Sequence, residues 1–184
     1  MILSEIFRAE IMCIADADIR IFTTDFLNNV VPEYFSTVAA SSTGKYHPWY
    51  SLGYGGLVRH TKAAVKVALD LLSLEQYSHL PKDVIISALI LHDTFKHGKM
   101  DWGYTVHVHP KLAADAIREM ATTKDDLIKM KLERIASLVE SHMGQWNVSN
   151  RDSWVLPKPL TDAQQFVHMC DYLASRKHII IEVQ

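Results

Sequence analysis

Apolar side chains recur at helical spacing along almost the whole sequence, and no segment shows the strict alternation of a half-buried strand. The stretches between the periodic segments are rich in Gly, Ser, Pro and aromatic residues, a composition typical of ordered loops. This pattern predicts an all-α protein in which each helix buries one apolar face against its neighbours. The predicted helices span residues 4–17, 24–36, 57–74, 82–96, 110–121, 126–143 and 160–177.

Length and charge set further limits, since the chain has 184 residues and a formal net charge of −2. The length predicts a single domain, because a domain takes roughly 150 residues. A nearly neutral chain has no bulk attraction for long duplex nucleic acid. Cys13 and Cys170 lie far apart, so no disulfide framework is expected. The chain opens without a basic leader and has no apolar run near the roughly 20 residues that span a bilayer, so we expect a cytoplasmic protein without membrane contact.

The apolar faces of five predicted helices each end in a side chain that can bind a metal ion. Ile85, Ala88 and Leu89 define one face of the 82–96 helix, and the next position on that face is His92. The same analysis of the other four faces ends on His60, His109, His142 and Asp171.

Burying these polar side chains together costs free energy unless a cation binds between them. A single histidine on an apolar face is usually a core residue bonded to a carbonyl, and that interpretation stays open for each one alone. Asp93, directly after His92, and Asp171 are too short to reach water from such a face, and a buried unpaired carboxylate costs several kcal/mol. A divalent metal ion would offset that cost. Imidazole and carboxylate ligands without cysteine suit Fe, Mn, Co, Ni or Zn and do not select among them.

Five motifs resemble those of a known family and occur in its order. They are GGLVRHT, LHDTFK, HPKLAADAI, ESHMGQW and HMCDYLASR. Together they resemble the HD-domain metal-dependent phosphohydrolases, an all-helical superfamily, over residues 55–177. The resemblance implies an HD-domain helical bundle, a single domain over 1–184 in which N-terminal helices and a substrate-side loop (1–54) precede a metal-binding core (55–177). The SHMG and DYLASR segments look closer to the HD domain of bacterial 3′→5′ exoribonucleases and to small phage-encoded HD proteins.

The resemblance also implies roles for individual positions. The positions that match the ligands of one metal ion across the superfamily are His60, His92, Asp93 and Asp171. His109 and His142 match the additional pair of its dinuclear members, which implies two divalent ions with Asp93 as the bridge. Lys96 matches a catalytic lysine that faces substrate phosphate. The alternative for Lys96 is a solvated side chain at the end of a helix, where the dipole favours it.

Basic and aromatic residues near these ligands predict contacts with substrate. The loop SSTGKYHPWYSLGYGG precedes the first ligand, and such side chains can stack on a base and hold a phosphate. The alternatives are packing of the aromatic rings against the core and surface salt bridges for the arginines. In the segment HVHP we favour His109 over His107 as the ligand, because His109 heads the helix as the family motif does. The predicted substrate contacts are Lys45, His47, Arg59, His107, Trp146 and Arg176.

Three hypotheses for function follow. The first is a dinuclear phosphohydrolase that cleaves a phosphate ester or anhydride of a nucleotide or short oligonucleotide in a bacterial or phage-infected cell. The second is a mononuclear nucleotidase or dNTP triphosphohydrolase, in which His109 and His142 contact substrate or support the ligands. The third is a nucleotide-binding module without turnover, against which the complete ligand set argues. The apolar N-terminal helices also leave pairing with a second chain open.

Overall fold

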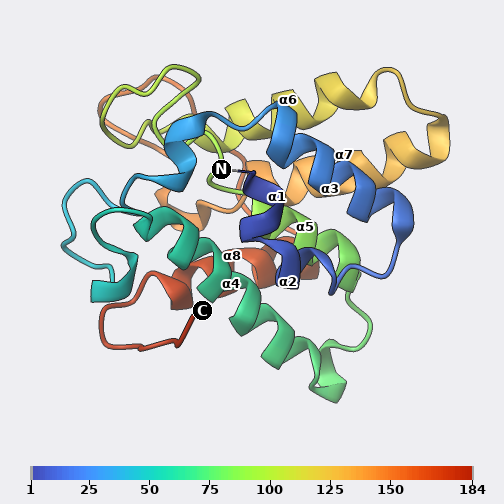
Figure 1. The fold of residues 1–184 in the computed structure, drawn as a ribbon, viewed down its shortest axis with the longest axis horizontal. Coiled ribbons are helices and arrows are strands. Elements are labelled where there is room, and N and C mark those ends of the chain that lie inside the picture. The colour runs from blue at the N-terminus through green and yellow to red at the C-terminus, as the bar shows by residue number, and fades with distance from the viewer. Residues whose placement is uncertain (1, 184) are drawn as a thin grey trace.

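The computed structural model describes residues 2–183, and helices and loops make up the fold (Figure 1). Within these residues there is no strand, and one isolated bridge joins Ser149 and Asp152. The all-α class predicted from helical periodicity is therefore confirmed. The elements are α1 (Leu3–Ile6), α2 (Arg8–Ile11), α3 (Ala17–Asn29), η1 (Glu33–Ser36), η2 (Trp49–Ser51), α4 (Gly56–Leu72), η3 (Glu75–Tyr77), α5 (Lys82–Leu91), α6 (His109–Ala121), α7 (Asp126–Glu140), η4 (Gly144–Trp146) and α8 (Asp162–Ala174), where η denotes a 3₁₀ helix.

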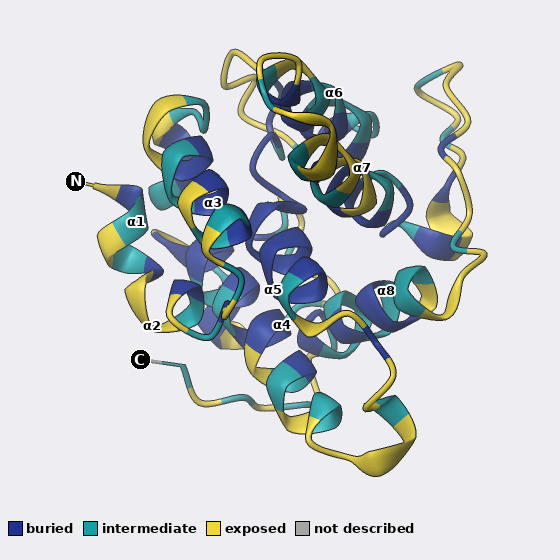
Figure 2. Ribbon diagram, turned by 90° about the vertical axis from the view of Figure 1, so that its right-hand side faces the viewer, coloured by how far each residue is buried: buried dark blue, intermediate teal, exposed yellow. Residues whose placement is uncertain are grey.

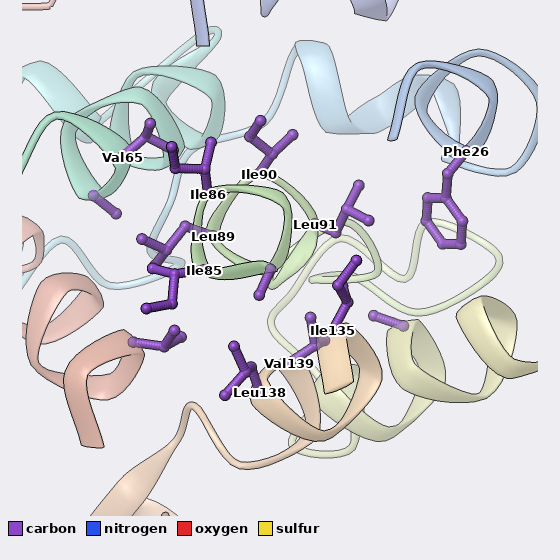
Figure 3. Packing of buried hydrophobic residues seen from close by; sticks show 14 of the residues in the cluster. Phe26, Val65, Ile85, Ile86, Leu89, Ile90, Leu91, Ile135, Leu138 and Val139 are labelled. Atoms are coloured by element: carbon purple, nitrogen blue, oxygen red, sulfur yellow. The ribbon is translucent and has the colours of Figure 1, made fainter. Parts of the chain in front are cut away.

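Helix α5 is the centre of the core. Every residue from Val84 to Leu91 is buried, and a helix that is apolar on all sides needs other helices around it. Helices α3, α4, α7 and α8 pack against it, and Figure 2 shows α5 as a largely buried element among them. In the close-up of Figure 3, Ile85, Ile86 and Leu91 point away from this helix in different directions. The segment that leads into His92 is thus held from every side.

Capping residues fix where the outer helices α7 and α8 begin. The Asp125 carboxylate accepts a hydrogen bond from the backbone N–H of Ile128 and caps α7. Thr161 and Gln164 form a reciprocal capping box at the start of α8. Helices α6 and α7 pack against each other as a helical hairpin, and α8 packs on α4. The elements that carry the predicted ligands therefore surround α5.

The N-terminal helices differ most from the prediction. The 4–17 helix is instead two short helices, α1 and α2, that meet at Phe7. The prediction of a helix over residues 24–36 was wrong as well, because α3 begins directly after Asp16 and ends before Pro32. The Asp16 carboxylate accepts two backbone N–H groups of the first turn, which starts the helix early. Pro32 lacks the N–H that a longer helix would need.

Helices α5 and α7 also end earlier than predicted, because polar side chains take their last carbonyl groups. Helix α5 ends at Leu91 rather than at residue 96, and α7 ends at Glu140 rather than at residue 143. His92 and His142 each donate from Nδ1 to the carbonyl three residues earlier, and Thr94 donates its hydroxyl in the same way. Such bonds compete with a further helical turn. The His92–Asp93 pair therefore lies in a turn after the helix.

Two general properties complete the fold. Cys13 and Cys170 are both free thiols, the first partly exposed and the second buried. Among residues 2–183, none of the helices combines the length and the apolar character that crossing a bilayer requires.

The central place of α5 predicts the effect of truncating its side chains. Leu89 on α5 is fully buried, whereas Leu127 on α7 is 62% exposed. Leu89→Ala is expected to lower the free energy of unfolding by about 2–5 kcal/mol, because it removes buried apolar surface and leaves a cavity. Leu127→Ala is expected to change it by less than about 0.5 kcal/mol. Urea unfolding followed by circular dichroism measures both, and equal losses would contradict this core.

Candidate metal centre

Six predicted ligands come together at one place beside the core. His60 lies on α4, the His92–Asp93 pair follows α5, His109 is the first residue of α6, His142 follows α7 and Asp171 lies on α8. The first five are fully or almost fully buried, and the Asp171 side chain is 20% exposed. The site is therefore shielded from solvent except on the side of Asp171.

The two carboxylate oxygens of Asp93 face different histidines. Asp93 Oδ2 lies 3.4 Å from His92 Nε2 and 3.8 Å from His60 Nε2. Asp93 Oδ1 lies 2.9 Å from His109 Nε2 and 3.6 Å from His142 Nε2. Asp93 thus stands between two groups of side chains.

These groups define two candidate sub-sites. In the first sub-site (His60, His92 and Asp171), Asp171 Oδ1 lies 3.0 Å from His60 Nε2 and 3.7 Å from His92 Nε2. One ligand atom from each of these three residues lies within 4.8 Å of the others, a spacing that could hold a metal ion. In the second sub-site (His109 and His142), the two Nε2 atoms are 3.3 Å apart. His142 also groups within 4.8 Å with His92 and Asp93, so the two sub-sites adjoin.

Three of the ligand histidines are oriented by their own backbone. His92, His109 and His142 each place Nδ1 at 2.6–2.7 Å from the carbonyl oxygen three residues earlier. A carbonyl can only accept, so Nδ1 carries the proton. When the ring is neutral, Nε2 then presents its lone pair to the centre, as a metal ligand requires.

Several buried polar atoms in this cluster lie close to other ligand atoms but make no hydrogen bond of good geometry among the described residues. They are both ring nitrogens of His60, His92 Nε2 and Asp93 Oδ1. An unsatisfied buried polar group costs about 1–3 kcal/mol, and an ionised one costs more. A divalent cation would supply a partner to the inward-facing atoms. The donor set therefore fits a metal ion.

The electrostatics of the cluster favour the metal-binding protonation states at both carboxylates and in the second sub-site, whereas His92 must lose a proton to bind a metal ion. Burial alone would raise the pKa values of Asp93 and Asp171, but Lys96 and His92 beside Asp93, and the imidazoles of His60 and His92 beside Asp171, hold both well below their usual range. Burial also opposes protonation of His92, yet the two carboxylates outweigh it and raise its pKa. In the second sub-site burial lowers the pKa of both histidines, that of His142 to about 3. Two carboxylates and two neutral imidazoles are thus available as ligands near neutral pH.

The predicted substrate contacts lie at different places around this centre. Lys96 is nearest, with Nζ at 2.8 Å from Asp93 Oδ2. The ring of His47 meets that of His60 edge-on at 5.5 Å, so the loop before α4 reaches the first sub-site. His107 lies in the wall of a separate hollow, and its Nε2 is buried without a hydrogen-bond partner.

Arg59 braces the loop ahead of α4. Its guanidinium donates to the backbone carbonyls of Tyr50, Leu52 and Tyr54. Gly56, at the start of α4, packs so closely on the Ser51 carbonyl that an added Cβ would overlap it. These contacts hold the loop on α4, and we therefore leave Arg59 out of the substrate contacts proposed below.

An aromatic–arginine cluster (Tyr46, Trp146, Tyr172 and Arg176) forms around the segment that follows Asp171. The rings of Trp146 and Tyr172 stack at 5.7 Å. The Arg176 guanidinium lies 4.3 Å from the Tyr172 ring centre and 5.7 Å from that of Tyr46. Lys45 Nζ lies 5.0 Å from the Tyr46 ring centre. Three predicted contacts, Lys45, Trp146 and Arg176, thus meet at one surface.

Periodicity did not identify two residues that support the centre. His168 places Nδ1 at 2.7 Å from the backbone carbonyl of His142 and so holds the turn that carries this ligand. Its position three residues before Asp171 puts it on the same face of α8, which was the available signal. Tyr34 donates its hydroxyl to the Gly98 carbonyl at 2.6 Å and accepts the His97 N–H at 3.1 Å. Nothing in the local sequence points to that contact.

Fold and site together define a class: a helical protein with a buried histidine–aspartate cluster that could hold a metal ion. A family model described as the HD domain matches residues 54–176. The chain therefore belongs to the HD-domain family of the metal-dependent phosphohydrolase superfamily, whose members are mostly metal-dependent hydrolases. The resemblance inferred from the five motifs is thereby confirmed. Comparison with curated proteins and with solved structures gave no significant match.

The contact between Lys96 and Asp93 predicts how metal affinity responds to charge. An ammonium so close to Asp93 competes with a dication for the same carboxylate and repels it. Lys96→Met is therefore expected to tighten Mn²⁺ binding by about tenfold or more. Lys99→Met removes the same charge from an exposed neighbour and is expected to leave binding unchanged. Isothermal titration calorimetry measures both, and an unchanged affinity in Lys96→Met would contradict the coupling.

Proposed function

We propose that this protein hydrolyses a phosphate ester or anhydride of a nucleotide or short oligonucleotide with two divalent ions, one at each sub-site. The observation that carries the two-ion part is the orientation of Asp93, which turns Oδ2 to the first sub-site and Oδ1 to the second. A carboxylate that presents one oxygen to each of two ligand groups has the arrangement of a bridging ligand. Fe, Mn, Co, Ni and Zn all suit these donors.

The chain's own contribution is to orient ligands and to place charge. A pair of divalent ions supplies, when bound, a water of lowered pKa and a clamp on the oxygens of an in-line phosphoryl transfer. The backbone carbonyls hold the histidine rings, so the Nε2 lone pairs converge without further rearrangement. Lys96 places an ammonium beside Asp93, where it neutralises phosphate charge as a point donor. Asp171 marks the side from which the phosphate enters.

The surroundings of the open side support a nucleotide as substrate. The Arg176 guanidinium donates to Ser175 Oγ and has no carboxylate partner among residues 2–183, which leaves its charge for a phosphate. Trp146 is 43% exposed and offers a face for stacking a base. Lys45 and His47 complete the proposed contacts. The net charge of −2 gives long duplex nucleic acid no bulk attraction.

A mononuclear nucleotidase or dNTP triphosphohydrolase is the second candidate. The second sub-site has only two imidazoles of its own and shares Asp93 with the first sub-site, which has three ligands of its own. In that case only the first sub-site binds metal. Closeness to the exoribonucleases or to the phage-encoded proteins, and action in the cytoplasm of a bacterial or phage-infected cell, remain predictions from the motifs.

Metal content separates these two candidates. Anaerobically purified, Mn²⁺-loaded protein is expected to hold two ions per chain, and His142→Ala only one, because the second sub-site loses one of its two imidazoles. His178→Ala, at an exposed position outside both sub-sites, is the control and should keep two. Atomic emission after gel filtration gives the counts. A single ion in the wild type that survives His142→Ala would exclude the two-ion proposal.

Turnover tests the activity itself. Wild-type protein with Mn²⁺, Co²⁺ or Fe²⁺ is expected to hydrolyse a member of a panel of nucleotides, dinucleotides and short RNAs. Asp93→Asn should lower kcat on the order of a hundredfold or more, since both sub-sites lose a shared negative ligand. Asp70→Asn, on the exposed face of α4, should retain full activity. If metal-loaded wild type binds nucleotides but cleaves none of the panel, the protein is a binding module.

A further inference from the structure

A concave feature lies between two long loops, apart from the metal centre. One loop (97–108) leads from the His92–Asp93 turn to α6, and the other (147–161) leads from η4 to α8; both lie at the upper left of Figure 1. They enclose a hollow of about 900 Å³. Its wall includes Trp102, Tyr104, His107, Met143, Arg151 and Trp154.

Hydrogen bonds close the bases of both loops. The Val106 N–H donates to the Lys96 carbonyl at 2.9 Å. In the second loop, the buried Asn147 donates its amide to the Leu156 carbonyl at 2.9 Å, and the Leu156 N–H returns a bond to the Asn147 carbonyl at 2.9 Å. The isolated bridge between Ser149 and Asp152 joins the two sides of this loop near its tip. The hollow is thus a built feature with defined walls, as loops that carry ligand sites often are.

The hollow presents large aromatic rings to solvent. Trp102, Tyr104 and Trp154 are 58%, 53% and 55% exposed. The ring centres of Trp102 and Tyr104 are 6.3 Å apart, and Lys111 Nζ lies 5.2 Å from the centre of the Trp154 ring. Single exposed apolar residues are ordinary, but three such rings around one hollow form a patch of the kind that marks binding surfaces.

The hollow shares its wall with the supports of the second sub-site. Val106, His107 and Val108 directly precede His109, and the Val106 carbonyl accepts the His109 Nδ1–H. Met143, which directly follows His142, lines the hollow as well. A ligand in the hollow therefore lies next to the segments that place both histidines.

We propose that this hollow binds a further nucleobase of a short oligonucleotide substrate, beyond the nucleotide whose base stacks on Trp146 at the open side of the metal centre; the assignment rests on the proposed function. The tryptophan faces supply stacking surfaces, and base stacking on an aromatic ring is tolerant of sequence. Polar groups on residues 149–153 lie in the same wall and can bond to the edge of a base. The Arg151 guanidinium has no ion pair with a described carboxylate. A volume of about 900 Å³ suits a nucleoside-sized ligand, whose sites have about 300–1,000 Å³.

Calorimetric titration of the full chain with adenosine, guanosine, cytidine and uridine tests the hollow. Nucleosides carry no phosphate, so their binding does not depend on hydrolysis. At least one is expected to bind, and Trp154→Ala or Trp102→Ala should weaken it by about tenfold. Trp154→Phe keeps a stacking face and should retain most of the affinity. Trp49→Ala removes an even more exposed ring, 73% exposed, outside the hollow and should leave binding unchanged.

The outcomes separate this proposal from the function on which it rests. If no nucleoside binds, or if both alanine variants bind as wild type does, the hollow is not a base site, whatever the hydrolysis panel shows. If nucleosides bind and depend on Trp154 but no nucleotide is hydrolysed, the hollow stands and the hydrolase proposal fails. Ribose 5-phosphate, which lacks a base, should bind wild type and Trp154→Ala equally, and a loss with this ligand would assign the effect to disturbed folding.

Discussion

The buried carboxylate of Asp93 is the constraint on which the rest of the structure depends. A fully buried carboxylate costs several kcal/mol unless cations or donors surround it. Because α5 is apolar on every side and ends directly before His92, the chain carries this carboxylate into the interior. Lys96 and four histidines then converge on its two oxygens from α4, from the turn itself and from the facing ends of α6 and α7. The arrangement of helices around α5 therefore positions the charge that organises the site.

The convergence could be predicted from sequence because each ligand is the next position on an apolar helical face. His92 continues the face of Ile85, Ala88 and Leu89, and a buried face must point its last side chain inward as well. The spacing of residues in the sequence could not show which ligands belong to which sub-site. The assignment of Asp93 Oδ2 to one group and Oδ1 to the other depends on side-chain rotamers and on packing between helices far apart in sequence.

Helix ends and supporting contacts were less predictable, for a physical reason. Periodicity describes which face is buried, but the end of a helix depends on which groups compete for its last carbonyls, as His92 and Thr94 do at α5. Arg59 shows the same limit. A basic residue beside a metal ligand suggests a phosphate contact, yet its guanidinium holds three loop carbonyls. That role follows from the path of the loop, which has no sequence period.

The N-terminal segment supports the turn that carries Asp93, although the family match begins at residue 54. Tyr34 lies outside that match, and its hydroxyl satisfies one N–H and one carbonyl of the turn that carries Asp93 and Lys96. Burial raises the pKa of Tyr34, so the hydroxyl keeps the proton that it donates to Gly98. Without this contact two buried backbone groups would lose their partners. The unit that must fold to place Asp93 is therefore larger than the segment that identifies the family.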